Sequence, residues 1–290
     1  MKKITALLFV ISLTTITFAQ NVKDELKNND SDSTEISGDN FSLEGALALF
    51  KKSNTLEDFE KALNEENNNV NNLDLNNDGN TDYISVQSIK DNDTHAIILS
   101  TYLKDNEKQD IATIGIEKTG KEEATLQIIG DEELYAKNTV VEPFEVDEKS
   151  EKSKGPNASE VRITRLIVNV WGWSCVRYMY APRYVVWNSP YYWGEYPSYW
   201  RPWRPMRYGV FYTRITPYRS YYRPTRTFRV INARNIYMPR RRTTTIIVHR
   251  NRGHKTVIIK QGRGVKAHKT VIHKTPRKVV VHKTPHRRRK

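Results

Sequence analysis

The chain of 290 residues contains a single cysteine, and its second half contains almost no acid. Because Cys175 has no partner, no disulfide can form within the chain, and we expect this thiol to pack as a small residue rather than to pair between chains. Residues 161–290 hold 31 Lys and Arg against one acid, whereas residues 1–160 hold 16 against 32. So sharp a change in charge predicts two unlike regions, separated by a polar linker at 147–157 (DEKSEKSKGPN).

Long apolar runs are also absent after the first 18 residues, so no later segment is expected to cross a membrane. Two lysines precede the apolar run 4–18, and small residues stand three positions and one position before Gln20. This arrangement predicts a signal peptide at 1–19, cleaved after Ala19. A membrane anchor is disfavoured because the run is shorter than the about 20 residues that span a bilayer. We therefore expect a periplasmic or secreted protein, located in the cell envelope or at the outer cell surface.

Composition divides the rest of the chain into regions of different character. The predicted regions are a disordered acidic lead-in at 20–41, a small acidic domain at 42–146, the linker at 147–157, an aromatic, Arg- and Pro-rich segment at 158–223, and a basic His-Lys-Thr-rich tail at 224–290.

The acidic domain begins with helix signals and continues with strand signals. Ser42 and Thr55 are N-cap candidates, and apolar residues follow each of them at helical spacing. A further edge strand is expected around 139–141. We predict an α+β fold in which an N-terminal helical hairpin packs on a four-stranded antiparallel meander. The four main strands, rich in β-branched residues and separated by turn formers, are expected at 82–89, 95–103, 111–118 and 124–129.

Residues 74–82 (DLNNDGNTD) place oxygen-bearing side chains at alternate positions, with Gly79 at the sixth position. This pattern matches the start of an EF-hand-type calcium loop, because Ca²⁺ takes about six to eight oxygen ligands and glycine permits the sharp bend. The twelfth position is Ser85 instead of a bidentate Glu, and the alternative is an Asx- and Gly-rich turn. We expect a structural Ca²⁺ site, whose predicted ligands are Asp74, Asn76, Asp78, Asn80 through its carbonyl, and Asp82.

Aromatic residues gather at 171–222, which contain all six Trp, 19 of the 30 aromatic residues, seven Arg and six Pro. Each Pro fixes φ and removes a backbone donor, so neither a long helix nor a central strand is expected here. Arginines bind phosphate and carboxylate in a bidentate manner, and aromatic rings stack on bases and sugar faces. We interpret the segment as a semi-rigid binding surface; the alternative is an aromatic cluster that serves stability alone. The expected contact residues are Trp193, Trp200, Arg201, Trp203 and Arg204.

The rest of the basic half contains weaker signals. Residues 161–170 (VRITRLIVNV) predict a strand, with which 184–187 can pair. Beyond residue 224, short β-type runs such as 228–232 and 243–248 alternate with basic turns. Dense like charge and few large apolar residues predict a largely disordered basic tail. Six of the seven histidines lie in this tail, and we expect them to add positive charge below about pH 6.5 rather than to bind metal.

These features predict an exported, non-enzymatic envelope protein that binds anionic envelope material through its cationic aromatic segment. The candidate partners are lipopolysaccharide, acidic polysaccharide, anionic lipids, extracellular nucleic acid, and the protein's own acidic domain in cis or in trans. No catalytic residue is predicted, because a hydrolase of envelope polymers needs paired carboxylates and the aromatic segment offers only Glu195. The alternatives are a self-assembling matrix protein, whose acidic and basic halves pair between chains, and, less favoured, such a hydrolase.

Four stretches of the sequence resemble a family of exported Bacteroidetes (flavobacterial) proteins with an acidic N-terminal domain and an aromatic, Arg-rich C-terminal region. The stretches are 42–46 (SLEGA), 71–79 (NNLDLNNDG), 128–135 (IIGDEELY) and 184–194 (YVVWNSPYYWG). The resemblance covers most of the predicted mature chain. It implies export and residence in the bacterial envelope, and it brings no activity and no site residues with it.

Overall fold

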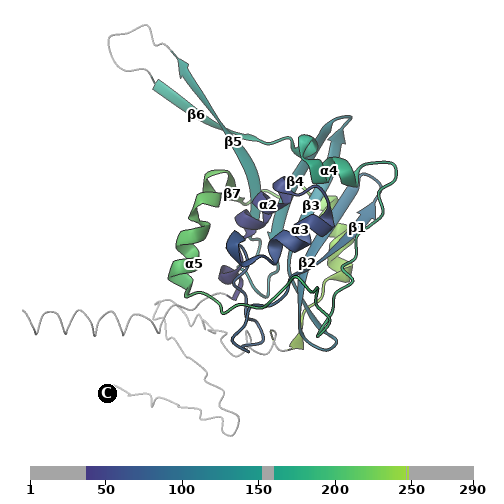
Figure 1. The fold of residues 1–290 in the computed structure, drawn as a ribbon. Helices are drawn as coiled ribbons and strands as arrows, with labels where there is room; N and C mark the ends of the chain where they lie inside the picture. Colours follow the sequence, from purple (N-terminus) through teal and green to yellow (C-terminus); the bar gives the residue numbers. More distant parts are fainter. Residues whose placement is uncertain (1–36, 152–159, 246, 248–290) are drawn as a thin grey trace, which may run out of the picture. The chain divides into compact units, whose positions relative to one another are not determined.

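The computed structural model describes residues 37–151, 160–245 and 247, which form an α+β fold with helices on both faces of an antiparallel sheet (Figure 1). The predicted signal peptide, most of the predicted lead-in and residues 248–290 of the predicted tail lie outside the described residues. The last part of that lead-in belongs to the fold, because Phe41 is buried and forms a β-bridge with Asn71. Within the described residues, no helix is both long and apolar enough to span a membrane.

The sheet has seven strands, in the order β1-β2-β3-β4-β5-β6, with β7 paired to β5. The sheet therefore has more strands than the four-stranded meander predicted from the sequence. Residues 140–143 of β5 explain the extension, because they pair with β7 from the basic half while Val140 and Val141 also pair with β4. The strands are β1 Ser85–Asp91, β2 Thr94–Lys104, β3 Glu107–Gly120, β4 Glu123–Gly130, β5 Val140–Glu151, β6 Glu160–Ile167 and β7 Tyr222–Thr225.

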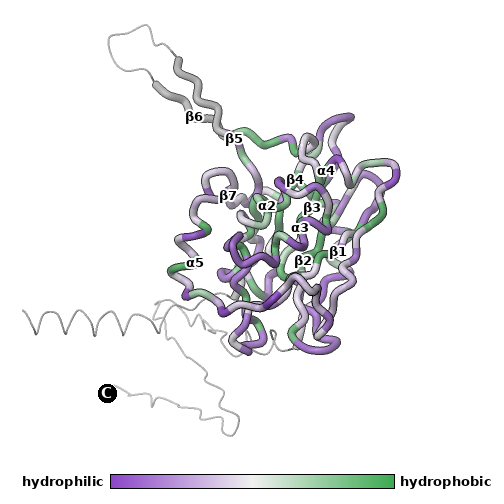
Figure 2. The backbone as a smooth tube through the Cα atoms, in the orientation of Figure 1, coloured by the Kyte–Doolittle hydropathy of each residue, from purple (hydrophilic) through white to green (hydrophobic). Residues whose placement is uncertain are grey.

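Helices α2 (Leu43–Lys52) and α3 (Leu56–Leu63) cover one face of the sheet (Figure 1). The predicted N-caps form: Ser42 Oγ accepts the Gly45 N–H at 2.9 Å, and Thr55 Oγ1 accepts the Asp58 N–H at 3.1 Å. The apolar side chains of both helices join those of the strands in one large core. Figure 2 shows the hydrophobic positions along α2 and the central strands, and the hydrophilic positions in the connecting loops.

Helix α4 (Ser174–Met179), from the basic half, lies on the same face and contributes to the same core. Cys175 is buried there, and the Trp173 ring lies 6.2 Å from the Phe50 ring of α2 between centroids. Residues on both sides of the predicted linker at 147–157 thus share a single hydrophobic core. The described part of that linker, residues 147–151, is the end of strand β5. Its polar composition therefore does not mark a boundary between two hydrophobic cores.

Helix α6 (Ile231–Tyr237) covers the opposite face of the sheet. The sequence predicted a β-type run at 228–232, and this prediction is wrong. Val230, Ala233 and Tyr237 recur at helical spacing and pack on Ala96 and on the neighbouring strand, forming a second apolar cluster.

Helix α6 packs close to the strands because the sheet has small residues at the contact. A Cβ added to Gly115 would come within 2.7 Å of Val230 and 2.8 Å of Ala233. Residues 224–245 therefore belong to the fold, and the expectation of a largely disordered tail at 224–290 does not hold for them.

The strand predicted at 161–170 forms only as far as Ile167, as β6, and it pairs with β5 and not with residues 184–187. The latter run instead follows the edge strand β1, where the Ser88 N–H donates to the Trp187 carbonyl at 2.8 Å. The run follows β1 because β1 is at the edge of the sheet, beside Glu60 of α3, whose carboxylate binds Trp187 and Ser189. The remaining helix is α5 (Tyr208–Ile215), and short 3-10 helices lie at Ser37–Asn40, Glu66–Asn68, Val170–Gly172, Thr216–Ser220 and Met238–Arg240.

Candidate functional site

Buried carboxylates of the acidic region hold the basic half in place, and Glu142 on β5 is the clearest of them. Its side chain is 1% exposed, and it accepts hydrogen bonds from Arg223 and Arg229, both at 3.1 Å. Gln127 on β4 donates to the same carboxylate at 2.9 Å and accepts the Arg229 backbone N–H at 2.8 Å. Because an unpaired buried carboxylate would cost several kcal/mol, these contacts fix the chain around β7 on the sheet.

Two further acids bind the end of the described chain. Asp131, directly after β4, accepts two hydrogen bonds from the Arg241 guanidinium, one of them at 2.7 Å. Asp110 on β3 accepts the Tyr237 hydroxyl at 3.1 Å and the Arg242 backbone N–H at 2.8 Å. Burial raises the pKa of Asp110, and the hydrogen bonds that it accepts partly offset this increase. The strand-side acids therefore anchor the segment that follows α6.

Glu60 of α3 anchors the aromatic segment. Its carboxylate accepts the Ser189 hydroxyl at 2.6 Å, the Trp187 indole N–H at 2.9 Å and the Tyr83 hydroxyl at 2.9 Å. A fourth hydrogen bond comes from the Val86 backbone N–H at 3.2 Å. Burial raises the pKa of the Glu60 carboxyl, while these donors counteract the increase. The arrangement fully satisfies one buried carboxylate, so its evident role is to position the chain.

Trp200, one of the expected contact residues, is only 8% exposed. Its ring lies 5.2 Å from the Tyr83 ring and 4.7 Å from the Tyr196 ring, measured between centroids. The Tyr191 ring joins the same group, 5.7 Å from Tyr83. The structure thus places Trp200 inside an aromatic cluster, the alternative considered for the whole segment, and its ring is not presented at the surface.

Trp193 lies at the tip of a turn that projects from this cluster. Tyr192 and Glu195 form a β-bridge across the turn, and their backbone N–H···O distances are 3.3 and 3.0 Å. Gly194 has a φ of +80°, a conformation that side chains rarely adopt, which explains glycine at this position. The Trp193 side chain is 37% exposed. It is therefore the expected contact tryptophan that the fold presents best.

Arg201 and Arg204 are both exposed, while Trp203 between them is half-buried. The Arg201 guanidinium donates to the Ser198 and Trp200 carbonyls at 3.0 and 2.7 Å, so its direction is partly fixed. The backbone of Trp203 is held by Thr81, whose N–H donates to the Trp203 carbonyl at 2.8 Å. Surface guanidiniums consequently stand on a chain that is itself tied to the acidic domain.

The predicted calcium ligands lie in an exposed loop in front of β1, and the structure brings only some of them together. Asp74 accepts the N–H groups of Asp78 and Gly79 at 3.1 and 3.0 Å, and Asn76 accepts the Asp78 N–H at 2.9 Å. Asp82 is buried, and its carboxylate accepts the Leu75 N–H at 2.7 Å.

Asp74, Asn76 and Asp78 thus supply oxygens suited to Ca²⁺, and the exposed Asn80 adds a carbonyl, whereas Asp82 is turned to the domain. Throughout the described residues, no three His, Cys, Asp or Glu side chains gather closely enough to share a metal ion. The oxygen donors of the loop supply only part of a Ca²⁺ coordination shell, and water molecules would have to supply the remaining ligands.

The loop 74–82 and the aromatic segment are neighbours, which the sequence did not predict. Thr81, inside the loop, binds Trp203 as described, and Asn72 forms two hydrogen bonds with the Met206 backbone, at 2.6 and 2.9 Å. Burial raises the pKa of Tyr196, and the charges of Asp82 and Asp78 raise it further. A change in the loop would therefore act on the chain that carries the exposed arginines.

The most connected residues of this arrangement were missed by sequence reasoning. Glu60 stands among Leu56, Phe59 and Leu63 on the buried side of α3, and an acid on an apolar helix face was a signal that could have singled it out. Glu142 and Asp110 likewise interrupt strand patterns. Their partners in the basic half lie 81 to 132 positions away along the chain, so no local pattern could identify them.

Comparison of this chain with protein-family models, with curated proteins and with solved structures found no match.

Proposed function

We propose that this protein is an exported, non-enzymatic binding protein of the bacterial envelope that holds anionic polymers through exposed arginines of its aromatic segment. One observation carries the proposal. Of the seven arginines in 171–222, only Arg219 forms an ion pair with an acid of the described residues, Glu44, at 3.8 Å. All seven are exposed. The other six are Arg177, Arg183, Arg201, Arg204, Arg207 and Arg214.

The buried acids and the exposed arginines together explain this surface. Carboxylates such as Glu142 and Asp131 are occupied by inner arginines, so they cannot neutralise the outer ones. Exposed rings accompany the outer arginines, including Trp193 at 37% and Tyr199 at 46% exposure. Guanidinium groups bind phosphate and carboxylate, and rings stack on sugars and bases. The chemistry supports lipopolysaccharide, acidic polysaccharide or extracellular nucleic acid as ligands.

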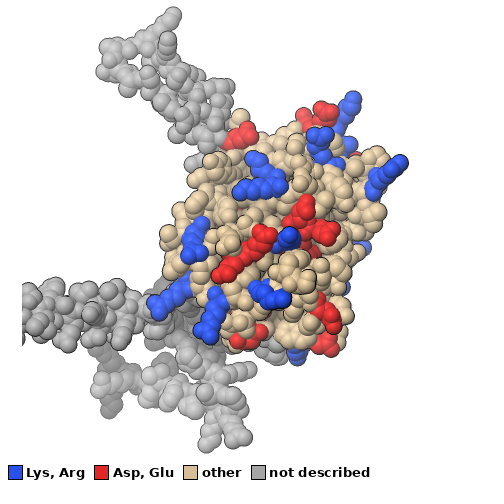
Figure 3. All heavy atoms as spheres, viewed as in Figure 1, with Lys and Arg blue, Asp and Glu red and all other residues tan. Residues whose placement is uncertain are grey.

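The distribution of charge favours a long ligand over a small ion. On the face that carries α2, α3 and α5, basic side chains are spread out with acidic side chains between them (Figure 3). Such a surface has no single concentrated basic patch in this view. A flexible polyanion can contact several separated arginines along its length, and each contact releases counterions.

We also propose that Ca²⁺ binds the loop 74–82 and stabilises the contact segment. The proximity of Thr81 to Trp203 supports the coupling, because the two residues share two hydrogen bonds, at 2.8 and 3.3 Å. The ion would be held by Asp74, Asn76 and Asp78, and its role would be structural. An affinity in the weaker range of extracellular calcium modules is expected, since few carboxylates contribute.

The experiment is a binding titration of the mature chain, residues 20–290, against lipopolysaccharide, an acidic polysaccharide and single-stranded DNA at low and high salt. The variant is Arg201→Gln with Arg204→Gln. The matched control is Lys121→Gln with Arg226→Gln, which removes the same charge from exposed positions outside residues 171–222. For single-stranded DNA, each lost contact should reduce the salt slope by about 0.7.

The proposal expects affinity for at least one polyanion that falls steeply with salt, and a larger loss in the Arg201/Arg204 variant than in the control. Equal losses in both variants would mean that net charge alone attracts polyanions, without a contact segment. An affinity that does not depend on salt concentration, or no binding at all, would overturn the proposal. The winning polymer identifies the class of ligand.

A further inference from the structure

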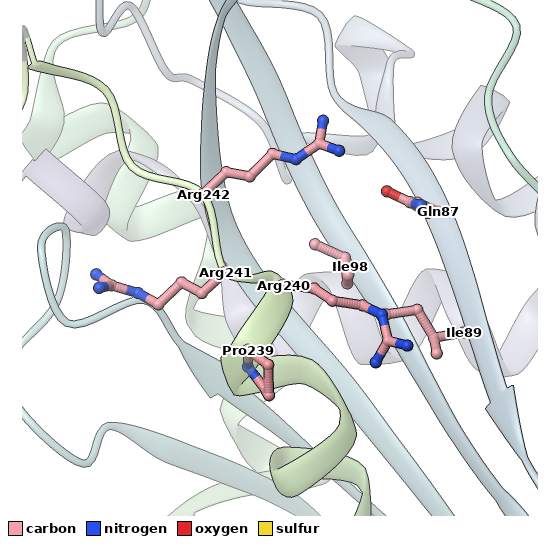
Figure 4. A pocket seen from close by; sticks show the side chains of 7 residues that line it. All are labelled: Gln87, Ile89, Ile98, Pro239, Arg240, Arg241 and Arg242. Carbon is pink, nitrogen blue, oxygen red and sulfur yellow. The ribbon is translucent and has the colours of Figure 1, made fainter.

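A hollow of about 480 Å³ lies on the α6 face of the sheet, where the chain leaves the 3-10 helix Met238–Arg240 (Figure 4). Its floor is formed by Gln87 and Ile89 of β1 and Ile98 of β2. Gln87 and Ile98 are paired in the sheet register, so these side chains lie on the same face. The volume is within the range of about 300–1,000 Å³ that small-molecule sites have.

Three consecutive arginines form the wall of the hollow, and they point in alternating directions. Arg241 extends away from the strands of the floor, toward Asp131, which binds its guanidinium in a bidentate manner. Arg240 and Arg242 extend the other way, toward the strands that carry Gln87, Ile89 and Ile98 (Figure 4). The ion pair of the middle arginine therefore determines where its two neighbours point.

The backbone at this position is held firmly by Asp110. Its carboxylate accepts the Arg242 N–H at 2.8 Å, and its own N–H donates to the Arg242 carbonyl at 3.0 Å. The Arg240 guanidinium donates to the Ile236 carbonyl of α6 at 2.7 Å. Two guanidiniums are thus presented to the hollow by a chain that is already ordered, which reduces the entropic cost of binding.

Among the described residues, the guanidiniums of Arg240 and Arg242 have no carboxylate partner, unlike that of Arg241, which pairs with Asp131. No acid of the described part of the chain lines the hollow. Lys108 is close to Arg242: burial lowers the pKa of Lys108, the charge of Arg242 lowers it further, and the charges of Asp110 and Glu60 oppose this decrease. An anion placed between the guanidiniums of Arg240 and Arg242 would reduce the repulsion among these positive charges.

We propose that this hollow binds a small organic anion with an apolar body. The carboxylate or phosphate of the ligand lies between Arg240 and Arg242, the Gln87 amide offers a further hydrogen bond, and the apolar body packs on Ile89 and Ile98. This site is separate from the polymer-binding segment of the proposed function, because none of its lining residues belongs to residues 158–223.

Calorimetric titrations of the mature chain with octanoate, phenyl phosphate, inorganic phosphate and octanol test the proposal. Saturable binding of octanoate or phenyl phosphate is expected, and which of the two binds more tightly identifies the head group. Inorganic phosphate and octanol, which each lack one half of the ligand, should bind at least about tenfold more weakly. Inorganic phosphate binding as tightly as both organic anions would overturn the role of the isoleucines, and octanol binding as tightly would overturn that of the arginines.

Arg240→Gln and Arg242→Gln should each weaken binding of the preferred anion by at least about tenfold, since each removes a charged donor. The backbone contacts of Asp110 persist, so Arg242→Gln should leave the thermal midpoint unchanged. Arg240→Gln also loses the exposed hydrogen bond to the Ile236 carbonyl and should lower the midpoint only slightly. Arg226→Gln removes the same charge from an exposed position that does not line the hollow, and it should bind normally. Equal weakening by Arg226→Gln, or no saturable binding by the parent chain, would overturn the site.

The Arg201/Arg204 double variant distinguishes the two proposals. It should bind the small anion as the parent does, even where it has lost polymer binding. Loss of both kinds of binding in this variant would mean that the small anion occupies the polymer surface, and the proposal for the hollow would then be wrong.

Discussion

The basic half of the chain contains two kinds of arginine. Arg223, Arg229 and Arg241 reach buried carboxylates of the sheet, at distances of 3.1 Å or less for their closest contacts. Arg201 and Arg204 are exposed and meet no acid of the described residues. The inner group adds to the apolar contacts that α4 and α6 make with the rest of the fold, and it helps to attach this half to the acidic sheet. The outer group is left over for a partner, so the same residue type serves the fold in one place and the surface in another.

The largest effect is expected from Glu142→Ala, because it would leave Arg223, Arg229 and Gln127 without their shared acceptor. We expect the free energy of unfolding in urea to fall by about 3–5 kcal/mol. Glu132→Ala is the control: Glu132 is 48% exposed and lies 3.8 Å from Arg241, so its loss should cost less than about 0.5 kcal/mol. Similar losses in the two variants would show that inner ion pairs contribute no more than surface ones.

His95→Phe tests an interior contact of the basic half that depends on pH. His95 is buried against the rings of Tyr180 and Tyr184. Burial and, to a lesser degree, the charge of Lys90 lower its pKa to about 4, while Asp93 opposes the decrease. The unfolded chain therefore takes up a proton near pH 6.5, whereas the folded chain does so only near pH 4. Stability is fully present above pH 6.5 and is lost as the pH falls toward 4, by up to about 3 kcal/mol.

Phenylalanine cannot take up a proton, so the variant should lack this loss. The measurement is the difference in unfolding free energy between parent and variant at pH 7.5 and at pH 4. Glu60 and Asp110 titrate in both proteins, and their contributions cancel in the difference. Parallel pH curves for the two proteins would mean that His95 is protonated inside the fold.

Glu60→Gln should be milder, with a loss of about 2 kcal/mol, because the amide nitrogen would face a donor such as Trp187 or Ser189. The matched control is Glu57→Gln, an exposed position on the same helix. Urea midpoints give the loss, and the tryptophan emission of the native state reports whether Trp187 becomes more solvated. Unchanged emission together with unchanged stability would contradict the anchoring role of Glu60.

Calcium should stabilise the protein by about 1.4 kcal/mol at a concentration ten times its dissociation constant. The thermal midpoint in Ca²⁺ and in chelator measures this, and Asp78→Ala should abolish the difference. Asp105→Ala, at an exposed turn outside the loop, should keep it. An identical response of all three proteins would leave the loop as an Asx- and Gly-rich turn.

The smallest effect on stability is expected from the double variant Arg201→Gln with Arg204→Gln. Both side chains are exposed, so the free energy of unfolding should change by less than about 0.5 kcal/mol. This variant is the counterpart of Glu142→Ala: the arginine variant should lose binding and keep its stability, whereas Glu142→Ala should lose stability. A large loss of stability would place these arginines with the inner group.

Local patterns allowed the acidic region to be predicted best. The caps Ser42 and Thr55 and the strand expected at 95–103 (β2, Thr94–Lys104) follow from neighbouring residues, because capping and alternation act within a few positions. The helix at Ile231–Tyr237 was misread because its few apolar residues include β-branched ones, and the Gly115 surface that accepts it lies on a distant strand.

The candidate site was less predictable. The run 200–205 repeats Trp-Arg-Pro, so its two tryptophans look equivalent in the sequence. Trp200 nevertheless packs on Tyr83, while Trp203 is only half-buried beside Thr81. Which arginines turn inward depends on acids up to 110 positions away, and charge composition contains no information on that pairing.

The acids of the inner ion pairs are synthesised before their arginine partners. Asp131 and Glu142 leave the ribosome long before Arg241 and Arg229, which follow 110 and 87 positions later. Until then the sheet lacks β7, α6 and the arginines that neutralise its buried carboxylates. We therefore expect the nascent chain to stay incompletely folded until it is nearly finished, which is the state in which a polypeptide can be threaded through an export channel. A chain ending at residue 221 should accordingly be digested by protease much faster than the full-length chain.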